Sequence, residues 1–328
     1  MGTRPSRRYT TSPVLEDRVR KGSGVTTSFE PSFAAGTVIQ GKWNKNQYQV
    51  ERLLGEGANG KVYLVRRGKK QFALKMGFDS LDHQSEVNAL QALSKSASSF
   101  QQLWLEADDF CWSGVDYPFS VMRYIKGKSL NDFIRDKGIE WIYLIGLNLL
   151  RKLTELHAGG YVFGDLKPEN MLITEYGDVE LIDFGGVTAK GRAVKQFTEV
   201  FDRGYWGGGS RVASEAYDLF SFAALMLGVA DRERTFARAA SMLPQNRTVD
   251  MLLDLLKANK SLASVEPILR KALTGRYETS KQALADWRAK SMLAARPVTK
   301  RNKHGAWIKA CFAASLMLFA AAVYFSLH

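Results

Sequence analysis

The run from Phe163 to Asn170, followed by the tripeptide Asp183-Phe184-Gly185, restricts the fold of this chain more than any other feature. It places two acids, a lysine and an amide at spacings that suit one task, which is to hold a metal, a nucleoside triphosphate and a hydroxyl group together. Asp165 is placed to accept the hydroxyl proton. Asn170 and Asp183 are placed to hold the metal, and Lys167 to steady the transferring phosphate.

A glycine-rich segment lies well before this run, between two strand-like stretches. It follows the pattern G-x-G-x-x-G-x-V, in which glycines let the backbone close over phosphate groups and direct amides at their oxygens. Taken alone the pattern is a weak signal, because glycine-rich hairpins arise easily. It predicts a phosphate-binding turn formed by Leu54, Gly55, Glu56, Gly57, Ala58, Asn59, Gly60, Lys61 and Val62.

Two further charges follow the glycine-rich segment in order. Lys75 ends the strand-like stretch from Phe72, and Glu86 lies eleven residues later on a predicted helix, where it is able to pair with Lys75. The alternative for each is an ordinary solvated side chain. Each signal is modest, but their order and spacing together with Asp165, Asn170 and Asp183 are hard to obtain by chance.

The chain changes from strand patterns to helix patterns along its length. Such an order within one domain predicts an α+β fold with a small β-rich lobe and a larger helical lobe. Strand patterns cover residues 48–50, 61–65, 72–75, 115–125, 171–173 and 179–182. Helical spacing covers residues 81–93, 141–157 and 217–229, and residues 232–287 are helical and amphipathic.

On these residues the chain resembles the eukaryotic-type (Hanks-type) Ser/Thr protein kinases, from Leu54 to about Asp218, with the catalytic domain extending to about residue 290. The resemblance implies the two-lobed protein kinase fold. Within the family the chain is most similar to a small membrane-anchored bacterial kinase associated with sporulation. That closer match is carried by Gly41-Lys42-Trp43-Asn44, Glu140-Trp141-Ile142, Phe163 to Pro168 and Asp202 to Gly207.

The resemblance also implies roles for individual residues. Lys75 would bind the α- and β-phosphates of ATP and pair with Glu86, and Asp165 and Lys167 would act on the hydroxyl group and the γ-phosphate. Asn170 and Asp183 would coordinate Mg²⁺, with Mn²⁺ as an alternative. Around the adenine ring we expect Val62, Ala73, Met122 as gatekeeper, Arg123 and Ile125 from the hinge, and Leu172; Asp218 would support the catalytic loop from beneath.

Three departures from the family pattern bear on regulation. Phe163-Gly164 replaces the His-Arg that commonly precedes the catalytic Asp, so no arginine is present there to receive an activating phosphate. No clear Ala-Pro-Glu follows Asp183, and Glu215 is a doubtful substitute. The stretch from Gly185 to Asp218 is short and glycine-rich. Candidate autophosphorylation sites are Thr198, which we favour, Thr188, Ser210 and Ser214, each of which could equally be an ordinary exposed hydroxyl.

The basic excess of the chain is concentrated in its last third. The net charge is +13, and residues 231–328 hold 17 Lys and Arg against seven Asp and Glu. This asymmetry predicts an anionic partner there, such as a membrane surface or nucleic acid. The two cysteines, Cys111 and Cys311, form no disulfide or metal-ligand pattern, which is typical of a reduced cytosolic domain.

An uncharged apolar segment ends the sequence. Residues 310–327 carry no charge, and from Trp307 the segment reaches 21 residues, which suits a single transmembrane helix. A buried terminal helix and an interfacial amphipathic helix are the alternatives. We expect a disordered segment at 1–36, a kinase domain at 37–290 (lobes 37–125 and 126–290), a basic linker at 291–306 and a span at 307–327, with the kinase domain in the cytoplasm at the cell membrane.

The basic linker has several interpretations that are compatible with one another. It could fix the membrane topology as a positive-inside flank, bind acidic lipid, or bind DNA phosphates without reading the base sequence. A solvated tail is the plainest alternative. Anion binding there could also cluster kinase molecules by self-association and so replace the missing control through the activation loop.

The sequence therefore predicts a tail-anchored, non-specific serine/threonine protein kinase that acts on cytoplasmic proteins and on itself. A membrane-tethered pseudokinase scaffold that binds nucleotide or DNA is the alternative from another class. However, pseudokinases usually lack one of the residues corresponding to Lys75, Asp165 and Asp183, and this chain has all three. A small-molecule kinase fits less well, because Lys167-Pro168-Glu169-Asn170 has the protein-kinase form.

Overall fold

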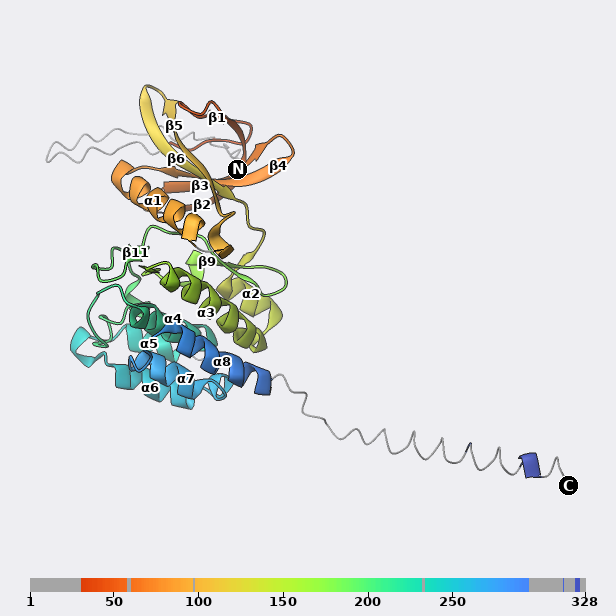
Figure 1. The fold of residues 1–328 in the computed structure, drawn as a ribbon. Coiled ribbons are helices and arrows are strands. Elements are labelled where there is room, and N and C mark those ends of the chain that lie inside the picture. The colour runs from red at the N-terminus through yellow and green to blue at the C-terminus, as the bar shows by residue number, and fades with distance from the viewer. Residues whose placement is uncertain are drawn as a thin grey trace, which may run out of the picture. The chain divides into compact units, whose positions relative to one another are not determined.

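The structure is a computed structural model that describes residues 31–57, 60–96, 98–231, 234–294, 315 and 322–324 of the 328-residue chain. The chain divides after Ser32, and a compact unit begins at Phe33. In this unit a twisted sheet and one long helix form a small lobe, and the remaining helices gather in a large lobe (Figure 1).

Six antiparallel strands build the sheet of the small lobe, in the order β1-β2-β3-β4-β6-β5. Alternating apolar residues on these strands face one side and form the small-lobe core, which includes Tyr48, Tyr63, Leu74 and Phe119. The strands are β1 (Val38–Gln40), β2 (Gln47–Gly57), β3 (Gly60–Arg67), β4 (Lys70–Gly77), β5 (Trp104–Trp112) and β6 (Val115–Arg123).

Helix α1 (Ser80–Ser96) crosses the sheet and faces the large lobe (Figure 1). Its buried residues Leu90 and Leu93 belong to the core of the large lobe, together with Phe100 from the short helix η1 (Ser98–Phe100). The ring of Phe184 contacts Phe100 at 6.0 Å and Phe163 at 6.1 Å between centroids. These contacts fix α1, and hence Glu86 on it, relative to the large lobe.

The large lobe is helical around α4, which is buried on nearly all sides. Its helices are α2 (Leu130–Lys137), α3 (Ile142–Ala158), α4 (Glu215–Ala230), α5 (Thr235–Ala240), α6 (Val249–Ala258), α7 (Glu266–Leu273) and α8 (Ser280–Ala294). Short 3₁₀ turns lie at Ile139–Trp141, Pro168–Asn170, Glu199–Phe201, Pro244–Asn246 and Lys260–Leu262. The short strands are β7 (Lys128–Ser129), β8 (Tyr161–Val162), β9 (Met171–Ile173), β10 (Val179–Leu181) and β11 (Thr188–Ala189).

Helix α8 belongs to the core of this lobe. Trp287 is completely buried, its ring lies 5.2 Å from that of Phe222, and its Nε1–H donates to the carbonyl of Tyr143 over 2.9 Å. Gly146 on α3 leaves the space that the indole fills, since a Cβ there would overlap the ring. Helix α8 is therefore part of the folded domain and not an appendage to it.

The α+β two-lobed fold is confirmed, and each predicted strand and helix is present near its expected position. The elements that were not predicted include β1, β5 and α2, the two-residue strands β7, β8 and β11, and short 3₁₀ turns. The expected boundary at residue 36 is wrong by a few residues, because Phe33 is buried against Tyr63 and Phe110 and its N–H donates to the Tyr63 hydroxyl. Folded structure therefore extends further toward the N-terminus than the polar composition indicates.

The predicted transmembrane segment at 307–327 lies outside the described residues, apart from residues 315 and 322–324, which are helical. The basic linker at 291–306 likewise lies outside them, apart from the end of α8. Among the helices that the structure describes, none has the length and apolar character needed to cross a bilayer.

Candidate active site

A buried ion-pair cluster joins the two lobes. Lys75, near the end of β4, donates from Nζ to Glu86 Oε2 over 2.7 Å and to Asp183 Oδ1 over 3.1 Å. Glu86 on α1 also accepts, at its other oxygen, the N–H of Phe184 over 3.4 Å. The structure thus brings together three charges that lie up to 108 residues apart in sequence, as the motif spacing predicts.

The protonation states in this cluster follow from burial and pairing. Burial alone would lower the pKa of Lys75, but Glu86 and Asp183 raise it above its usual value. Burial would raise the pKa of Asp183, but Lys75 and the Gly185 N–H hold it below its usual range. At neutral pH Lys75 is therefore a cation and Asp183 an anion, as binding to phosphate and to a metal ion requires.

A cavity of about 540 Å³ lies beside the cluster, between the sheet and the large lobe. Its walls contain most residues that the sequence predicts around a nucleotide base: Leu54, Gly55, Glu56, Val62, Ala73, Met122, Arg123, Ile125 and Leu172. Ile182, Leu103 and Glu169, which were not predicted, line it as well. An apolar slot with peptide groups at one edge suits a flat heteroaromatic ring.

The glycine-rich turn is described only in part. Gly57 and Gly60 pair at the ends of β2 and β3, and Ala58 and Asn59 lie outside the described residues. The buried Lys61 has its Nζ 3.4 Å from Glu56 Oε1 and 5.8 Å from the ring centroid of Phe78. Lys61 thus lies on the inner side of the turn.

A second cluster surrounds the carboxylate of Asp165. Its Oδ1 accepts from the Thr198 hydroxyl over 2.7 Å, and its Oδ2 accepts from Lys167 Nζ over 2.8 Å and from Asn170 Nδ2 over 3.1 Å. Three donors therefore fix the orientation of one carboxylate. Lys167 and Asn170 were expected here, whereas Thr198, from the segment after Asp183, was predicted only as an autophosphorylation site.

Asn170 and Asp183 fit a divalent metal. The amide nitrogen of Asn170 is occupied by the carbonyl and carboxylate of Asp165, which leaves its oxygen as a ligand. The N–H of Ile182 donates to the carbonyl of Asn170 over 3.1 Å and ties the two segments together. No group of three or more His, Cys, Asp and Glu side chains forms a metal site in the described part of the chain. Amide and carboxylate oxygens are the ligands that hard divalent cations prefer when they also bind phosphates.

The backbone just before Asp165 is held by a buried carboxylate. Asp218 on α4 accepts the N–H of Phe163 over 2.7 Å and the N–H of Gly164 over 3.0 Å. Gly164 has φ +83°, and a Cβ there would lie 2.8 Å from the Gly186 carbonyl oxygen. Glycine at 164 is therefore explained by backbone geometry, and Asp218 lies where the sequence places it.

Another buried carboxylate, Asp202, was not predicted as a site residue. It accepts from Arg211 Nε over 2.8 Å, from the Tyr205 N–H over 2.9 Å and from the Tyr217 hydroxyl over 2.8 Å. Arg211 also covers the ring of Phe197 at 4.3 Å. Asp202 thus organises the segment that carries Thr198. The sequence signal was Asp202-Arg203-Gly204-Tyr205, but nothing in it names the partners.

The predicted phosphorylation sites differ in accessibility. Thr188 is buried, and its hydroxyl donates to the carbonyl of Gly186 over 2.8 Å. The hydroxyl of Ser214 caps α4 by accepting the Tyr217 N–H, and Ser210 is exposed. Among the four candidates only Ser210 is exposed, with its hydroxyl accepting from Arg203 Nη2 over 3.4 Å, whereas the Thr198 hydroxyl donates to Asp165.

Comparison with known proteins places these features in context. Residues 48–300 match the family model described as protein kinase domain. The chain is 39% identical to serine/threonine-protein kinase YabT of Bacillus subtilis (strain 168) over 264 residues, which are 79% of this chain and 76% of that protein. It is 31% identical to a probable serine/threonine-protein kinase of Clostridium perfringens over 44% of this chain and 22% of that protein. Rho-associated protein kinase 1 of Homo sapiens is 26% identical over 42% of this chain and 11% of its own length.

Proposed function

Since the chain belongs to the protein kinase family and is a serine/threonine protein kinase, we propose that it transfers the γ-phosphate of Mg·ATP to serine and threonine hydroxyls of cytoplasmic proteins and of itself. One observation carries this proposal. The Lys75–Glu86–Asp183 cluster and the Asp165–Lys167–Asn170 cluster are both formed in the same structure. Both are needed for transfer, one to hold the nucleotide and one to hold the hydroxyl group.

The residues divide the chemistry between them. In the transfer, a bond forms between the hydroxyl oxygen and the γ-phosphorus, the bond to the bridging oxygen breaks, and ADP leaves. Asp165 takes the hydroxyl proton, and Lys167 offsets negative charge on the transferring group. Mg²⁺, when bound at Asn170 and Asp183, supplies further neutralisation of the phosphates. Lys75, fixed by Glu86, binds the remaining phosphates of the nucleotide.

The test separates an active kinase from the pseudokinase scaffold. The full-length protein in detergent is incubated with labelled ATP and either Mg²⁺ or Mn²⁺, and label on protein is measured beside nucleotide binding. We expect incorporation that Lys75→Met and Asp183→Asn abolish. Nucleotide binding without incorporation under either metal would favour the scaffold, and label that persists in both variants would contradict the assigned site.

Membrane attachment is a second part of the proposal. It is supported by the uncharged residues 310–327 after a basic linker, a pattern typical of a single span with the kinase domain on the cytoplasmic side. Alkaline extraction of membranes should leave the full-length protein in the pellet and release a protein that ends at residue 306. Recovery of the full-length protein in the alkaline supernatant would contradict the span.

Activation by an anionic surface is a third part. Two observations support it. Residues 231–328 contain 17 basic but only seven acidic residues, and position 164 holds glycine where the family commonly has arginine. Duplex DNA and vesicles with acidic lipid are added separately to the full-length protein at low salt, with neutral vesicles as control. Stimulation that declines with salt is expected from one or both. Indifference to both additions would contradict the proposal, and a dilution series would show whether self-association is involved.

The cellular role rests on the resemblance to a sporulation-associated kinase, and autophosphorylation at Thr198 or Thr188 stays a prediction. We propose that the substrates act during sporulation. Comparison of the phosphoproteome with and without the gene, at intervals during spore formation, tests this directly. Mass spectrometry of the purified protein after incubation with ATP locates its own phosphorylated residues, and an unmodified Thr198 would contradict our favoured site.

A further inference from the structure

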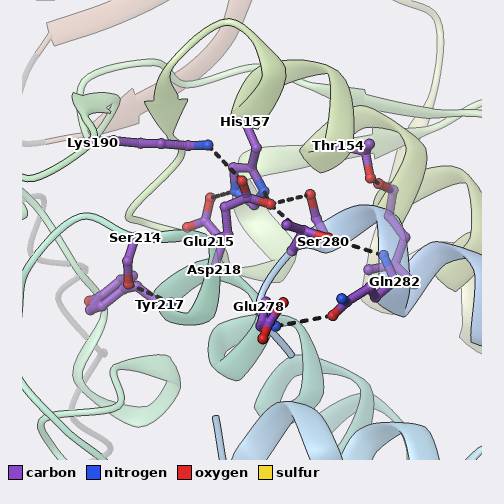
Figure 2. A network of polar contacts seen from close by, with 12 residues as sticks. Thr154, His157, Lys190, Ser214, Glu215, Tyr217, Asp218, Glu278, Ser280 and Gln282 are labelled. Carbon is purple, nitrogen blue, oxygen red and sulfur yellow. Dashed lines mark hydrogen bonds and ion pairs between the residues drawn. The ribbon is translucent and has the colours of Figure 1, made fainter. Parts of the chain in front are cut away.

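Glu215, on the first turn of α4, contacts three separate parts of the chain. Its Oε1 accepts from Lys190 Nζ over 2.6 Å, and its Oε2 accepts both the N–H and the hydroxyl of Ser280 over 2.7 and 2.8 Å. His157 Nδ1, at the end of α3, lies 3.5 Å from the same Oε2. Figure 2 shows these side chains converging on one carboxylate from the two sides of α4.

His157 joins this carboxylate to the catalytic loop. Its imidazole is buried, and Nε2 lies 2.9 Å from Asp218 Oδ2, so that the ring stands between the carboxylates of Glu215 and Asp218. Asp218 in turn holds the backbone N–H groups of Phe163 and Gly164, just before Asp165. A continuous series of polar contacts therefore leads from Glu215 to the residue that takes the proton.

The other end of the series is the start of α8. The first N–H groups of a helix have no partner within the helix, and a carboxylate placed there satisfies one of them and interacts favourably with the helix dipole. Glu215 does this for Ser280, the first residue of α8, while Gln282 accepts the N–H of Glu278 nearby. Since Trp287 locks α8 against α3 and α4, the Glu215 carboxylate is held from a rigid element.

We propose that Glu215 is a positioning residue for phosphoryl transfer, which fixes Asp165 by holding His157 against Asp218. It touches neither nucleotide nor substrate, and its effect passes through the backbone of the catalytic loop. This inference rests on the kinase activity described above. It assigns a role to a residue that the sequence offered only as a doubtful substitute for the glutamate of the missing Ala-Pro-Glu.

Charge on His157 gives the proposal a distinctive signature. Burial alone would lower the pKa of His157, but Asp218 and Glu215 raise it above its usual value. Lys190 is the nearby cation, and it pairs with Glu215 on the side away from His157 Nδ1, at Oε1. The contribution of the charged ring is therefore present at low pH and is lost as pH rises through this raised pKa. Without the Glu215 charge, the contribution of the charged His157 ring should be lost at a lower pH.

The first test compares Glu215→Gln with the full-length wild-type protein in detergent. We expect kcat for phosphate transfer to fall at least about tenfold, since small displacements of catalytic groups have such effects. The KM for ATP should stay within about twofold, because Lys75 and Asp183 are untouched, and the rate should decline at lower pH than in wild type. Glu266→Gln is the matched control, since Glu266 is similarly exposed and pairs with Arg270 on α7.

A second measurement reads His157 directly and does not depend on activity. The chain has four histidines, so ring signals of ¹³C-labelled histidine can be followed by NMR, with His157 identified by its loss in His157→Asn. The pKa of His157 should fall in Glu215→Gln. In Lys190→Met, which removes a cation that competes for Glu215, it should stay at or above the wild-type value.

Three outcomes would overturn the proposal. The first is a kcat for Glu215→Gln within twofold of wild type, and the second is an unchanged His157 titration in that variant. The third covers the case in which Glu215→Gln fails to fold. Glu215→Asp draws the carboxylate back from His157, and a wild-type kcat together with an unchanged His157 titration in Glu215→Asp would show that the position of this carboxylate does not act on the catalytic loop.

Discussion

The nucleotide side and the substrate side of the site are built in different ways. On the nucleotide side, Lys75, Glu86 and Asp183 meet directly, and each follows a local sequence motif. On the substrate side, the catalytic loop and the segment that carries Thr198 are held by two buried carboxylates, Asp218 and Asp202, and no arginine precedes Asp165. The first arrangement joins motif residues directly to one another, while the second depends on buried carboxylates that lie outside the catalytic loop.

The difference predicts how substitutions on each side affect the activity. In the proposed function, binding of the nucleotide depends on three charges whose geometry is mutually fixed, so we expect substitutions there to abolish activity. The substrate side is supported from beneath, and its supports lie at a distance from the reacting atoms. Substitutions there should lower the transfer rate and the stability by intermediate amounts and leave the affinity for the nucleotide unchanged.

The largest effect should come from Asp165→Asn, which removes the proton acceptor and leaves the nucleotide side intact. We expect kcat to fall by about 10²–10⁴-fold, the range for a positioned general base, with ATP affinity within about threefold of wild type. Single-turnover phosphate transfer and a nucleotide-binding titration measure the two quantities. A parallel loss of ATP affinity would mean that the two sides are not separable.

Lys75→Met should give the next largest effect, this time on stability. Removing one partner of a buried ion pair leaves Glu86 and Asp183 without their cation and should cost about 3 kcal/mol or more of unfolding free energy. The stranded carboxylates bind protons more tightly when folded, so the deficit should shrink as pH is lowered. Denaturant titration between pH 5 and pH 8 checks this. A deficit that grows toward low pH would contradict the account.

Asp202→Asn tests the substrate side. The amide cannot accept from Arg211, Tyr205 and Tyr217 together, so we expect a loss of about 2 kcal/mol in unfolding free energy. The KM for a protein substrate should rise, while the KM for ATP should not. Steady-state kinetics with both substrates varied gives the comparison. Equal changes in the two KM values would break the division between the sides.

Gly164→Ala should have the smallest effect, about 1–2 kcal/mol, because alanine is strained at φ +83° and its Cβ would press on the Gly186 carbonyl. Gly191→Ala is a matched control. Gly191 has φ +84°, and nothing lies within 4 Å of a Cβ built there. Thermal melts of both variants isolate the cost of the close contact, and kcat should fall only in Gly164→Ala.

The sequence predicts the nucleotide side well, because its residues stand at fixed places on strands and helices with regular periodicity. Lys75 ends an alternating strand, and Glu86 follows on an amphipathic helix, so the local pattern already places both. The same holds for the elements: long periodic segments were found, whereas the short α2 and the irregular β5 were not. Both carry local signals that periodicity does not reveal, since β5 forms a hairpin with β6 around Ser113-Gly114 and Ser129 caps α2.

The substrate side was harder to predict for a related reason. Asp202 and Glu215 are charged residues in glycine-rich or helical surroundings, where a solvated side chain is the usual outcome. Their burial depends on Arg211, Tyr217 and Ser280, and no spacing rule connects them. The sequence pattern marks His157 only as the end of a helix, although a histidine two residues before Gly159-Gly160 and a strand is a usable signal. Whether such residues are buried depends on contacts with residues far away in the chain, and a single sequence shows no pattern from which these contacts can be read.

The burial of Trp287 has a consequence for how far the catalytic domain can travel. Because Trp287 is buried in the core, the folded domain includes α8, which ends at Ala294. If the proposed span starts at Trp307, twelve residues lie between the two points, and a fully extended chain of that length reaches at most about 45 Å. The enzyme would then work within a thin shell along the bilayer, and its local concentration of substrate would depend on which proteins enter that shell.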